Sequence, residues 1–396
     1  MPVPVQVLFL IDLLARFGIL LIIALSLNLE FGYTGIPNFG KLLAVAGGAF
    51  AVGFIPGRMA CWLFGIGAGL DYSRLSHSIV TDINRVLANN PATALALFFF
   101  TLVIAGIVGA GLGFISCYPA IRLREEYLAI TLLVMGEAIR IIGLNYPPIV
   151  GGTLGVMVPD PFRWAGELRY VVSCLVIVGI ALLVFFYLEV LVRTPLGRML
   201  RAIRDNEDVA KSLGKDVTRA RMKAIMISAA IAAIGGALYA FHTSNVFSGT
   251  YDRGTWTFWP WVMVVLGGAA NNIGVLLGAF GIEFLRKLVL FYRDQLAALS
   301  LDIPLAFPFF RFRFPFAVPY PYPVSTLRFS IPFDPVWLSP LMFGVALILI
   351  QMFRPEGVLR EKPTSTLGYE KLKKKFSLRK AVSSSEREDS TSGRGD

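Results

Sequence analysis

The sequence is poor in charge, in histidine and in cysteine. Of its 396 residues only 16% are charged, against roughly a quarter in ordinary soluble proteins, which argues against a water-exposed globular surface over most of the chain. No spacing typical of metal ligands joins its two histidines and three cysteines (His77, His242, Cys61, Cys117 and Cys174). We therefore expect no metal site, surface positions for the histidines, and buried apolar positions for the cysteines.

Hydrophobic residues make up 56% of the chain and are gathered in long runs. Apolar runs of about 18 residues or more predict helices that span a membrane. The sequence therefore predicts an all-α, polytopic helical membrane protein with about nine spans, including broken or re-entrant segments. The expected spans cover residues 7–29, 42–55, 92–117, 127–144, 170–192 and 224–239, two short segments on either side of a break at 267–274, and 337–353.

Charge is concentrated in residues 193–223 and in the C-terminal tail. Residues 193–223 carry nine basic and four acidic side chains, and the chain after Phe353 carries eleven and seven. Basic segments beside membrane spans are typical of the cytoplasmic side, and they account for most of the net charge of +11 without nucleic acid as a partner. We expect a membrane domain over 1–353, with residues 193–223 as a cytoplasmic loop, and a basic, disordered cytoplasmic tail over 354–396. Residues 293–335, rich in proline and aromatic residues, are expected to form an external loop.

The middle of residues 193–223 predicts a short, capped helix. Asp205 is the expected N-cap, and Asp208 lies where an acidic residue supports the first turn. Glu207 and Lys211 form an i,i+4 pair of opposite charge. Gly214 follows the last apolar residue and is placed as a left-handed C-terminal stop.

One edge of this short helix is apolar and consists of Val209, Ala210 and Leu213. A helix of about ten residues is marginally stable alone in water. We therefore expect the apolar edge to dock on another surface. An ordinary solvated loop with a capped turn is the alternative interpretation.

Two apolar segments are interrupted by glycine, one in each half of the chain. The first break covers residues 32–40 and the second covers residues 267–274. Helices broken at membrane depth must face protein or a water-filled cavity, and paired breaks are typical of transporters in which a pathway runs between two halves. A carboxylate inside a span, at Glu137, is also a functional candidate, although it can form a structural pair with Arg140. A tight turn between helices is the alternative for the first break. The candidate pathway residues are Gly32, Gly35, Asn38, Gly40, Glu137, Gly267 and Gly268.

Several stretches resemble one family of transport proteins. Residues 208–214, DVAKSLG, resemble the EAA-x-x-x-G segment of ABC-importer permeases, with Asp208 in the place of the acidic residue. The run from Thr194 to Ala240 is similar to the permease subunits of branched-chain amino acid ABC importers, the membrane-spanning subunits of binding-protein-dependent transporters. GYTG at 32–35 and the closing FRPEGVL also resemble this family, whereas Lys41 stands where many members have histidine.

The resemblance implies a multi-pass subunit of the plasma (inner) membrane that imports branched-chain or related amino acids by ATP-driven alternating access. It implies as partners two cytosolic ATP-binding subunits, a second homologous permease subunit and an extracellular substrate-binding protein. The sequence contains no P-loop of the form GxxxxGK[ST], so we expect no enzyme and no bound cofactor, with ATP used by the partner subunits. The residues implied in ATPase coupling are Asp205, Glu207, Asp208, Val209, Ala210, Leu213 and Gly214.

Three other functions stay open on the sequence. The same type of importer could carry urea, short amides or sugars, because no pattern of a binding pocket is visible. An ion-coupled secondary transporter would use a coupling carboxylate such as Glu137 and would not need the capped cytoplasmic helix. An intramembrane enzyme would need clustered histidine, cysteine or acidic residues, and the spans supply no recognisable set.

Overall fold

The computed structural model describes residues 5–66, 71–123 and 125–291, together with positions 341, 344–345, 348, 352–353 and 357–361. The long elements in this part of the chain are helices, which confirms the predicted all-α membrane fold. The expected external loop at 293–335, most of the last span and nearly all of the tail at 354–396 lie outside the described residues.

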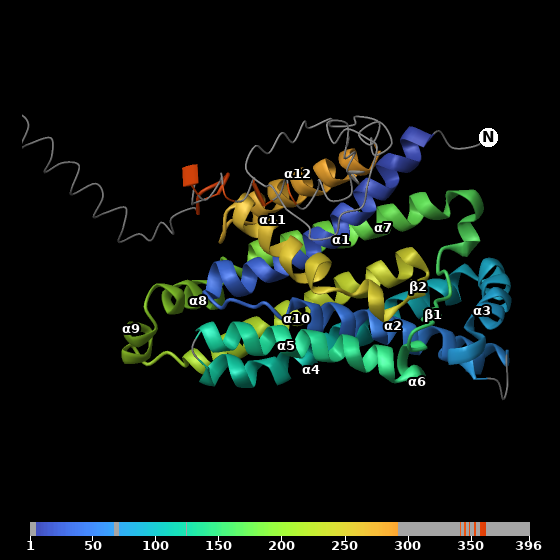
Figure 1. The fold of residues 1–396 in the computed structure, drawn as a ribbon, viewed down its shortest axis with the longest axis horizontal. Coiled ribbons are helices and arrows are strands. Elements are labelled where there is room, and N and C mark those ends of the chain that lie inside the picture. Colours follow the sequence, from blue (N-terminus) through green and yellow to red (C-terminus); the bar gives the residue numbers. More distant parts are fainter. Residues whose placement is uncertain are drawn as a thin grey trace, which may run out of the picture. The chain divides into compact units, whose positions relative to one another are not determined.

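The helices follow one another with short connections (Figure 1). In chain order the elements are α1 (Val5–Thr34), α2 (Lys41–Phe64), α3 (Tyr72–Asn89), α4 (Pro91–Arg122), α5 (Glu125–Asn145), α6 (Pro147–Val150), β1 (Val156–Met157), the 3₁₀ helix η1 (Arg163–Leu168), α7 (Arg169–Leu191), α8 (Pro195–Asp205), α9 (Glu207–Ser212), α10 (Val217–Thr243), β2 (Asn245–Val246), η2 (Ser248–Thr250), the π-helical turn η3 (Gly254–Phe258), α11 (Trp259–Gly267) and α12 (Asn272–Phe291). Strands β1 and β2 form one short antiparallel pair, with Val156 opposite Val246.

Helices α2 and α10 form the centre of the bundle. Among the described residues, six helices are long and apolar enough to cross a membrane, and in α2 and α10 the most apolar stretch is 78% and 72% buried. The same share is only 22–28% in α4, α5 and α7, whose outer faces carry exposed Phe99, Ile130 and Leu183. Apolar side chains on an outer face suit contact with lipid, so these three helices form the periphery of the bundle.

Glycine allows α2 and α10 to approach closely. A Cβ atom built at Gly48 would lie 2.0 Å from the carbonyl oxygen of Ala233, and one at Gly236 would lie 2.0 Å from that of Val45. Because any larger residue would push the two backbones apart, these glycines set the spacing of the central pair, as small residues do between helices in membranes.

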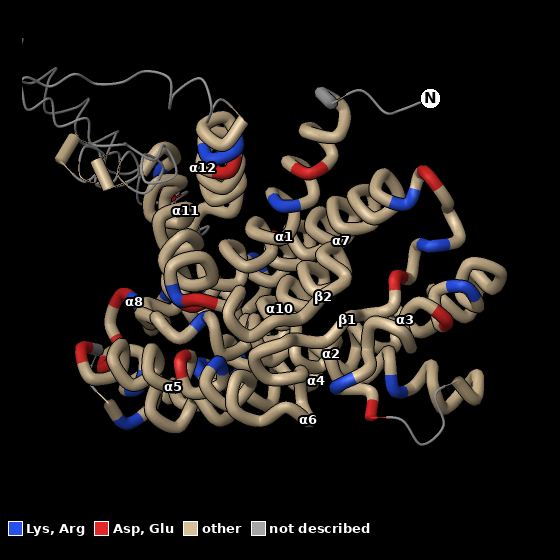
Figure 2. The backbone as a smooth tube through the Cα atoms, turned by 45° about the vertical axis from the view of Figure 1, so that its right-hand side comes forward, with Lys and Arg blue, Asp and Glu red and all other residues tan. Residues whose placement is uncertain are grey.

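The two ends of the bundle are distinct. Figure 1 shows α9 at one end and α3 with the strand pair at the other. Lys, Arg, Asp and Glu gather mainly towards these two ends, whereas α1 and α12 each carry both signs of charge along their length (Figure 2). Residues 193–223 and α3 therefore lie at opposite ends of the helix bundle (Figure 1).

The apolar segment after Trp259 is two helices, as the sequence predicted. Helix α11 has nine residues, too few to cross a bilayer, and α12 packs back against it. A Cβ atom at Gly267 would lie 2.2 Å from the Gly274 carbonyl oxygen. The amides of Val358 and Leu359 donate hydrogen bonds to the carbonyl oxygens of Leu266 and Gly267, at 2.9 and 3.1 Å, so these two residues satisfy the end of α11.

One sequence-based placement was wrong. His242, expected at the surface, is buried except for 12% of its side chain, and its Nε2 lies 3.5 Å from Asp12 Oδ1. His242 lies in the last turn of α10, and α10 packs against α1. Trp256, which follows α10, is also buried: it is 2% exposed and donates a hydrogen bond through Nε1 to the Thr250 carbonyl oxygen at 3.0 Å.

Candidate functional site

Residues 193–223 contain two complete helices and the start of α10, where the sequence predicted a single capped helix. The expected N-cap, Asp205, is the last residue of α8. The residue that caps α9 is Asn206, whose backbone is extended and whose Oδ1 accepts a hydrogen bond from the Val209 amide at 3.0 Å. The cap is displaced by one position because the chain must turn at Asn206 to start a new helix. Asp208 therefore lies in the first turn of α9, where a negative charge is favourable.

One residue of the apolar edge of α9 is buried against the protein, and the other two are exposed on its surface. Ala210 is 3% exposed and packs against the body of the protein, whereas Val209 and Leu213 are 54% and 73% exposed. Gly214 has a φ of +73°, the left-handed conformation that the sequence predicted for the helix stop. The structure thus presents two large apolar side chains on a short, well-terminated helix.

Charged contacts hold α9 to α10. The Glu207 carboxylate lies 2.7 Å from Lys211 Nζ, which confirms the expected i,i+4 pair, and 2.9 Å from an Arg221 guanidinium nitrogen. The hydrogen bond from Lys211, followed by the charge of Arg221, lowers the pKa of Glu207 below its usual 4.5. Since Arg221 belongs to the first turns of α10, Glu207 links the small helix to one of the two central helices.

Helix α8 contacts the first glycine break. The Arg204 guanidinium donates a hydrogen bond to the carbonyl oxygen of Gly32, and the Arg201 guanidinium lies 5.2 Å from the centre of the Tyr33 ring. Gly35, with a φ of +73°, lies beside the Arg204 side chain. The loop that carries α9 is therefore attached directly to the end of α1.

The two glycine breaks, far apart in the sequence, meet in the structure. Asn28 on α1 donates to Asn272 Oδ1 at 3.0 Å and accepts a hydrogen bond from the Ala270 amide at 2.9 Å. A Cβ atom at Gly32 would lie 2.4 Å from that same amide nitrogen. Ala270 has a φ of +60°, unusual for a residue other than glycine. The pairing of breaks that the sequence suggested as a topological pattern is thus a physical contact.

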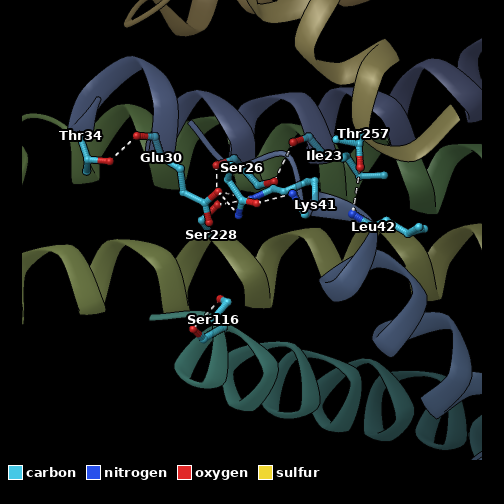
Figure 3. Close-up of polar contacts among 12 residues, drawn as sticks. Ile23, Ser26, Glu30, Thr34, Lys41, Leu42, Ser116, Ser228 and Thr257 are labelled. Atoms are coloured by element: carbon cyan, nitrogen blue, oxygen red, sulfur yellow. Dashed lines mark hydrogen bonds and ion pairs between the residues drawn. The ribbon is translucent and has the colours of Figure 1, made fainter. Parts of the chain in front are cut away.

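A buried ion pair lies next to the first break (Figure 3). Glu30 Oε2 is 3.1 Å from Lys41 Nζ, and the two side chains are 0% and 1% exposed. Lys41 Nζ also donates to Ser228 Oγ on α10, and Asn38 Nδ2 donates to the same Glu30 oxygen at 2.7 Å. The pair joins the end of α1, the start of α2 and the middle of α10. Because removing one member of a buried pair leaves an uncompensated charge, the pair fixes these three elements together.

The remaining pathway candidates are distributed around this contact. The Asn38 carbonyl oxygen accepts a hydrogen bond from Trp261 Nε1 at 3.0 Å, and Gly40 packs against the Leu132 backbone of α5. Gly268 has a φ of +108° directly after α11. Glu137 lies elsewhere: its carboxylate pairs with Arg140, as expected, and lies 3.4 Å from Arg253. The structure therefore gathers the glycines and Asn38 around two breaks and places Glu137 in a separate ion-pair cluster.

Sequence reasoning missed the Glu30–Lys41 pair and the contacts of Asn28 and Arg204. The sequence does contain a signal for the pair, since an acidic and a basic residue flank a break in an otherwise apolar region and charges there need partners. The predicted span ended at residue 29, which left Glu30 outside it. The contacts of Asn28 and Arg204 join segments more than 170 residues apart and carry no local signal.

The chain is similar in sequence to one family of transport proteins. The family described as branched-chain amino acid transport system / permease component matches residues 9–350. The chain is 39% identical over 355 residues to the probable branched-chain amino acid transport permease protein LivM of Methanocaldococcus jannaschii, covering 89% of this chain and 94% of that one. It is 28% identical over 304 residues to the high-affinity branched-chain amino acid transport system permease protein LivM of Salmonella typhimurium, covering 70% of this chain and 63% of that one.

A second kind of permease is also similar to this chain. The probable branched-chain amino acid transport permease protein LivH of Methanocaldococcus jannaschii is 22% identical over 283 residues, covering 69% of this chain and 78% of that one. No solved structure matches the chain. The extent of the family match and the identity to LivM lead to one conclusion: this chain is a membrane protein of the family of branched-chain amino acid transport permeases.

Proposed function

We propose that this chain is the permease subunit of an ATP-driven importer for branched-chain or related amino acids, in the plasma membrane. Two cytosolic ATP-binding subunits drive it, a second, homologous permease subunit completes the pathway, and an extracellular binding protein delivers the substrate. The family supports the substrate class, and the similarity to both LivM and LivH supports a second permease. The ATP-driven step is supported by the geometry of α9.

The observation that carries the proposal is the pair of exposed apolar side chains on α9. Val209 and Leu213 are 54% and 73% exposed on a helix whose Glu207 and Lys211 side chains are held in ion pairs. A six-residue helix gains little stability of its own in water, so its fixed shape and exposed apolar edge suit a surface that docks on a partner. A groove of a cytosolic ATP-binding subunit is the partner we propose.

Movement of α9 would reach the glycine breaks through a short series of contacts. The ion pair between Glu207 and Arg221 would transmit the movement to α10. The hydrogen bond from Arg204 to the Gly32 carbonyl oxygen would transmit it from α8 to α1. The residue that faces Gly32 is Ala270, in the second break. Alternating access in this proposal is a change in how the two breaks pack, with Gly32, Gly35, Asn38, Gly40, Gly267 and Gly268 beside the pathway.

Reconstitution of the complex tests this function against an ion-coupled mechanism. The chain is co-purified with its ATP-binding, permease and binding-protein partners and placed in proteoliposomes, and uptake of radiolabelled L-leucine is measured. We expect uptake that requires ATP on the side of α9 and persists without a proton or sodium gradient, and we expect Glu137→Gln to leave it intact. Uptake by the chain alone, driven by an ion gradient and lost in Glu137→Gln, would establish the ion-coupled transporter instead.

A further inference from the structure

A cavity of about 220 Å³ opens beside the N-terminal half of α1. Its wall comes from four places in the chain: α1, the end of α10, the segment from Thr250 to Trp256, and α12. At about 30 Å³ per water molecule the volume corresponds to roughly seven waters, which is room for a small molecule but not for a peptide. The cavity lies along the same helix that carries Asn28, Glu30 and Gly32.

Charge is unevenly distributed in the wall of this cavity. Arg16 and Arg286 contribute two guanidinium groups, and Asp252 contributes one carboxylate. The nearest acid to Arg16 is Asp12 at 3.6 Å, but Asp12 also contacts Lys287 and His242. The Arg16 side chain lines the cavity and is 34% exposed, and a guanidinium carries five hydrogen-bond donors. The cavity wall therefore offers charged donors to an added anion.

Arg286, the second arginine of the wall, has an acidic neighbour but no close ion pair with it. Arg286 lies 3.8 Å from Glu283, a distance at which the two charges attract without forming a hydrogen bond. Glu283 itself is 1% exposed, and its Oε2 has no hydrogen-bond partner within the described part of the chain. The guanidinium of Arg286 thus keeps donors for a group inside the cavity.

The carboxylate of Asp252 is held in place from one side. Its Oδ1 accepts a hydrogen bond from the Thr255 amide at 2.9 Å, at the start of η3. An ionised carboxylate accepts several hydrogen bonds, so Asp252 can also receive one from a cation in the cavity. The rest of the wall includes Ile19, Leu20 and the ring of Trp256, whose Nε1 is already used by Thr250. This part of the wall offers only apolar surface.

We propose that this cavity is a substrate site that binds the zwitterion of an apolar α-amino acid. The substrate carboxylate lies against Arg16 and Arg286, its ammonium group against Asp252, and its side chain against Ile19, Leu20 and Trp256. This site rests on the proposed function, since it assigns that function a place where an amino acid enters.

Competition binding with three probes tests the assignment. Radiolabelled L-leucine binding to the co-purified complex, without binding protein, is competed with L-leucinamide, which lacks the carboxylate, and with 4-methylpentanoate, which lacks the ammonium group. We expect the unmodified complex to prefer leucine by at least about tenfold over each analogue. Arg16→Gln should lose the preference over leucinamide, and Arg16→Lys should retain it. Asp252→Asn, which keeps the oxygen that accepts the Thr255 amide, should lose the preference over 4-methylpentanoate.

Changes in these two ratios separate recognition from folding, because a misfolded variant lowers the binding of all three probes together. The matched control is Arg74→Gln, at an exposed arginine on α3, which should leave both ratios unchanged. The proposal is overturned if the complex does not bind leucine, or if Arg16→Gln and Asp252→Asn leave the ratios as they were. ATP-driven leucine uptake is measured in the same preparations: uptake with unchanged ratios rejects the cavity alone, and altered ratios without uptake reject the importer alone.

Discussion

The Arg204 guanidinium donates a hydrogen bond to the carbonyl oxygen of Gly32, and this contact joins the α8–α9 loop to the break at the end of α1. Four residues earlier on α1, Asn28 binds the Ala270 amide of the second break. A change at one end of the bundle therefore has a continuous set of contacts to both broken segments.

Charge on the exposed edge of α9 should abolish coupling without preventing insertion. Val209→Asp and Leu213→Asp place a carboxylate on side chains that are 54% and 73% exposed, so the fold tolerates them while an apolar docking groove does not. We expect substrate-stimulated ATP hydrolysis by the co-purified complex to fall at least about tenfold. Thr218→Asp, at an exposed position in the first turn of α10, adds the same charge nearby and should leave hydrolysis normal. Normal hydrolysis in both edge variants would count against the docking role.

The Glu30–Lys41 pair should show strong coupling in a double-mutant cycle. Removing one partner leaves the other charged and buried, so Glu30→Gln or Lys41→Met alone should cost about 3–5 kcal/mol in the free energy of unfolding. The double variant Glu30→Gln/Lys41→Met removes both charges and should be much less destabilised than the sum of the single variants. Unfolding in denaturant, followed in detergent, measures all three. Additive effects would show that the two charges do not stabilise each other.

Gly32 should tolerate no side chain, because the second break lies against it. Gly32→Ala would place a Cβ atom 2.2 Å from Asn28 Oδ1 and 2.4 Å from the Ala270 amide nitrogen, and overpacking of this kind costs about 1–3 kcal/mol. We expect leucine uptake to be lost or strongly reduced. Gly179→Ala on α7 is the matched control, since nothing lies within 4 Å of its added Cβ, and it should stabilise α7 by about 0.5–1 kcal/mol. Equal leucine uptake in Gly32→Ala and Gly179→Ala would show that the packing of the two breaks is not needed for transport.

Acid should loosen α9 through Glu207. The folded-state pKa of this carboxyl lies below its usual 4.5 because Lys211 and Arg221 favour the charged form. Its contribution to the stability of α9 is therefore fully present above that usual value and is lost as the pH falls through the folded-state pKa. A spin label at Ser212→Cys, in a chain without the three native cysteines, should gain mobility as the pH falls below 4.5.

Two variants decide whether this response belongs to Glu207. In Glu207→Gln the label should already be mobile at neutral pH and should change little on acidification. In Asp208→Asn, which removes the neighbouring exposed carboxylate, the response should remain. If the acid-induced gain in mobility disappeared in Asp208→Asn and persisted in Glu207→Gln, the response would belong to Asp208 and the prediction would be wrong.

Hydropathy predicted most of the helices because every residue of a lipid-exposed span must be compatible with an apolar solvent. The stop at Gly214 and the Glu207–Lys211 pair were also predictable, since both depend only on neighbours within one helical turn. The burial of Trp256 was not, because an aromatic residue near a span end fits an interface or a core equally well until its partners are known. The Glu30–Lys41 pair and the Asn28–Asn272 contact depend on which helices pack together, and a single sequence does not specify that.

The central claim is that the exposed edge of α9 docks on an ATP-binding subunit at the cytoplasmic side, and photo-crosslinking tests it most directly. A photoreactive amino acid is placed at Leu213 in cells that express the whole system, with the exposed positions Thr218 and Thr81 as controls. We predict a crosslink from position 213 to a nucleotide-hydrolysing subunit, a weaker one or none from 218, and none from 81 on α3. A crosslink to that subunit from 81 and not from 213, or labelling of 213 by a membrane-impermeant reagent from outside the cell, would contradict the account.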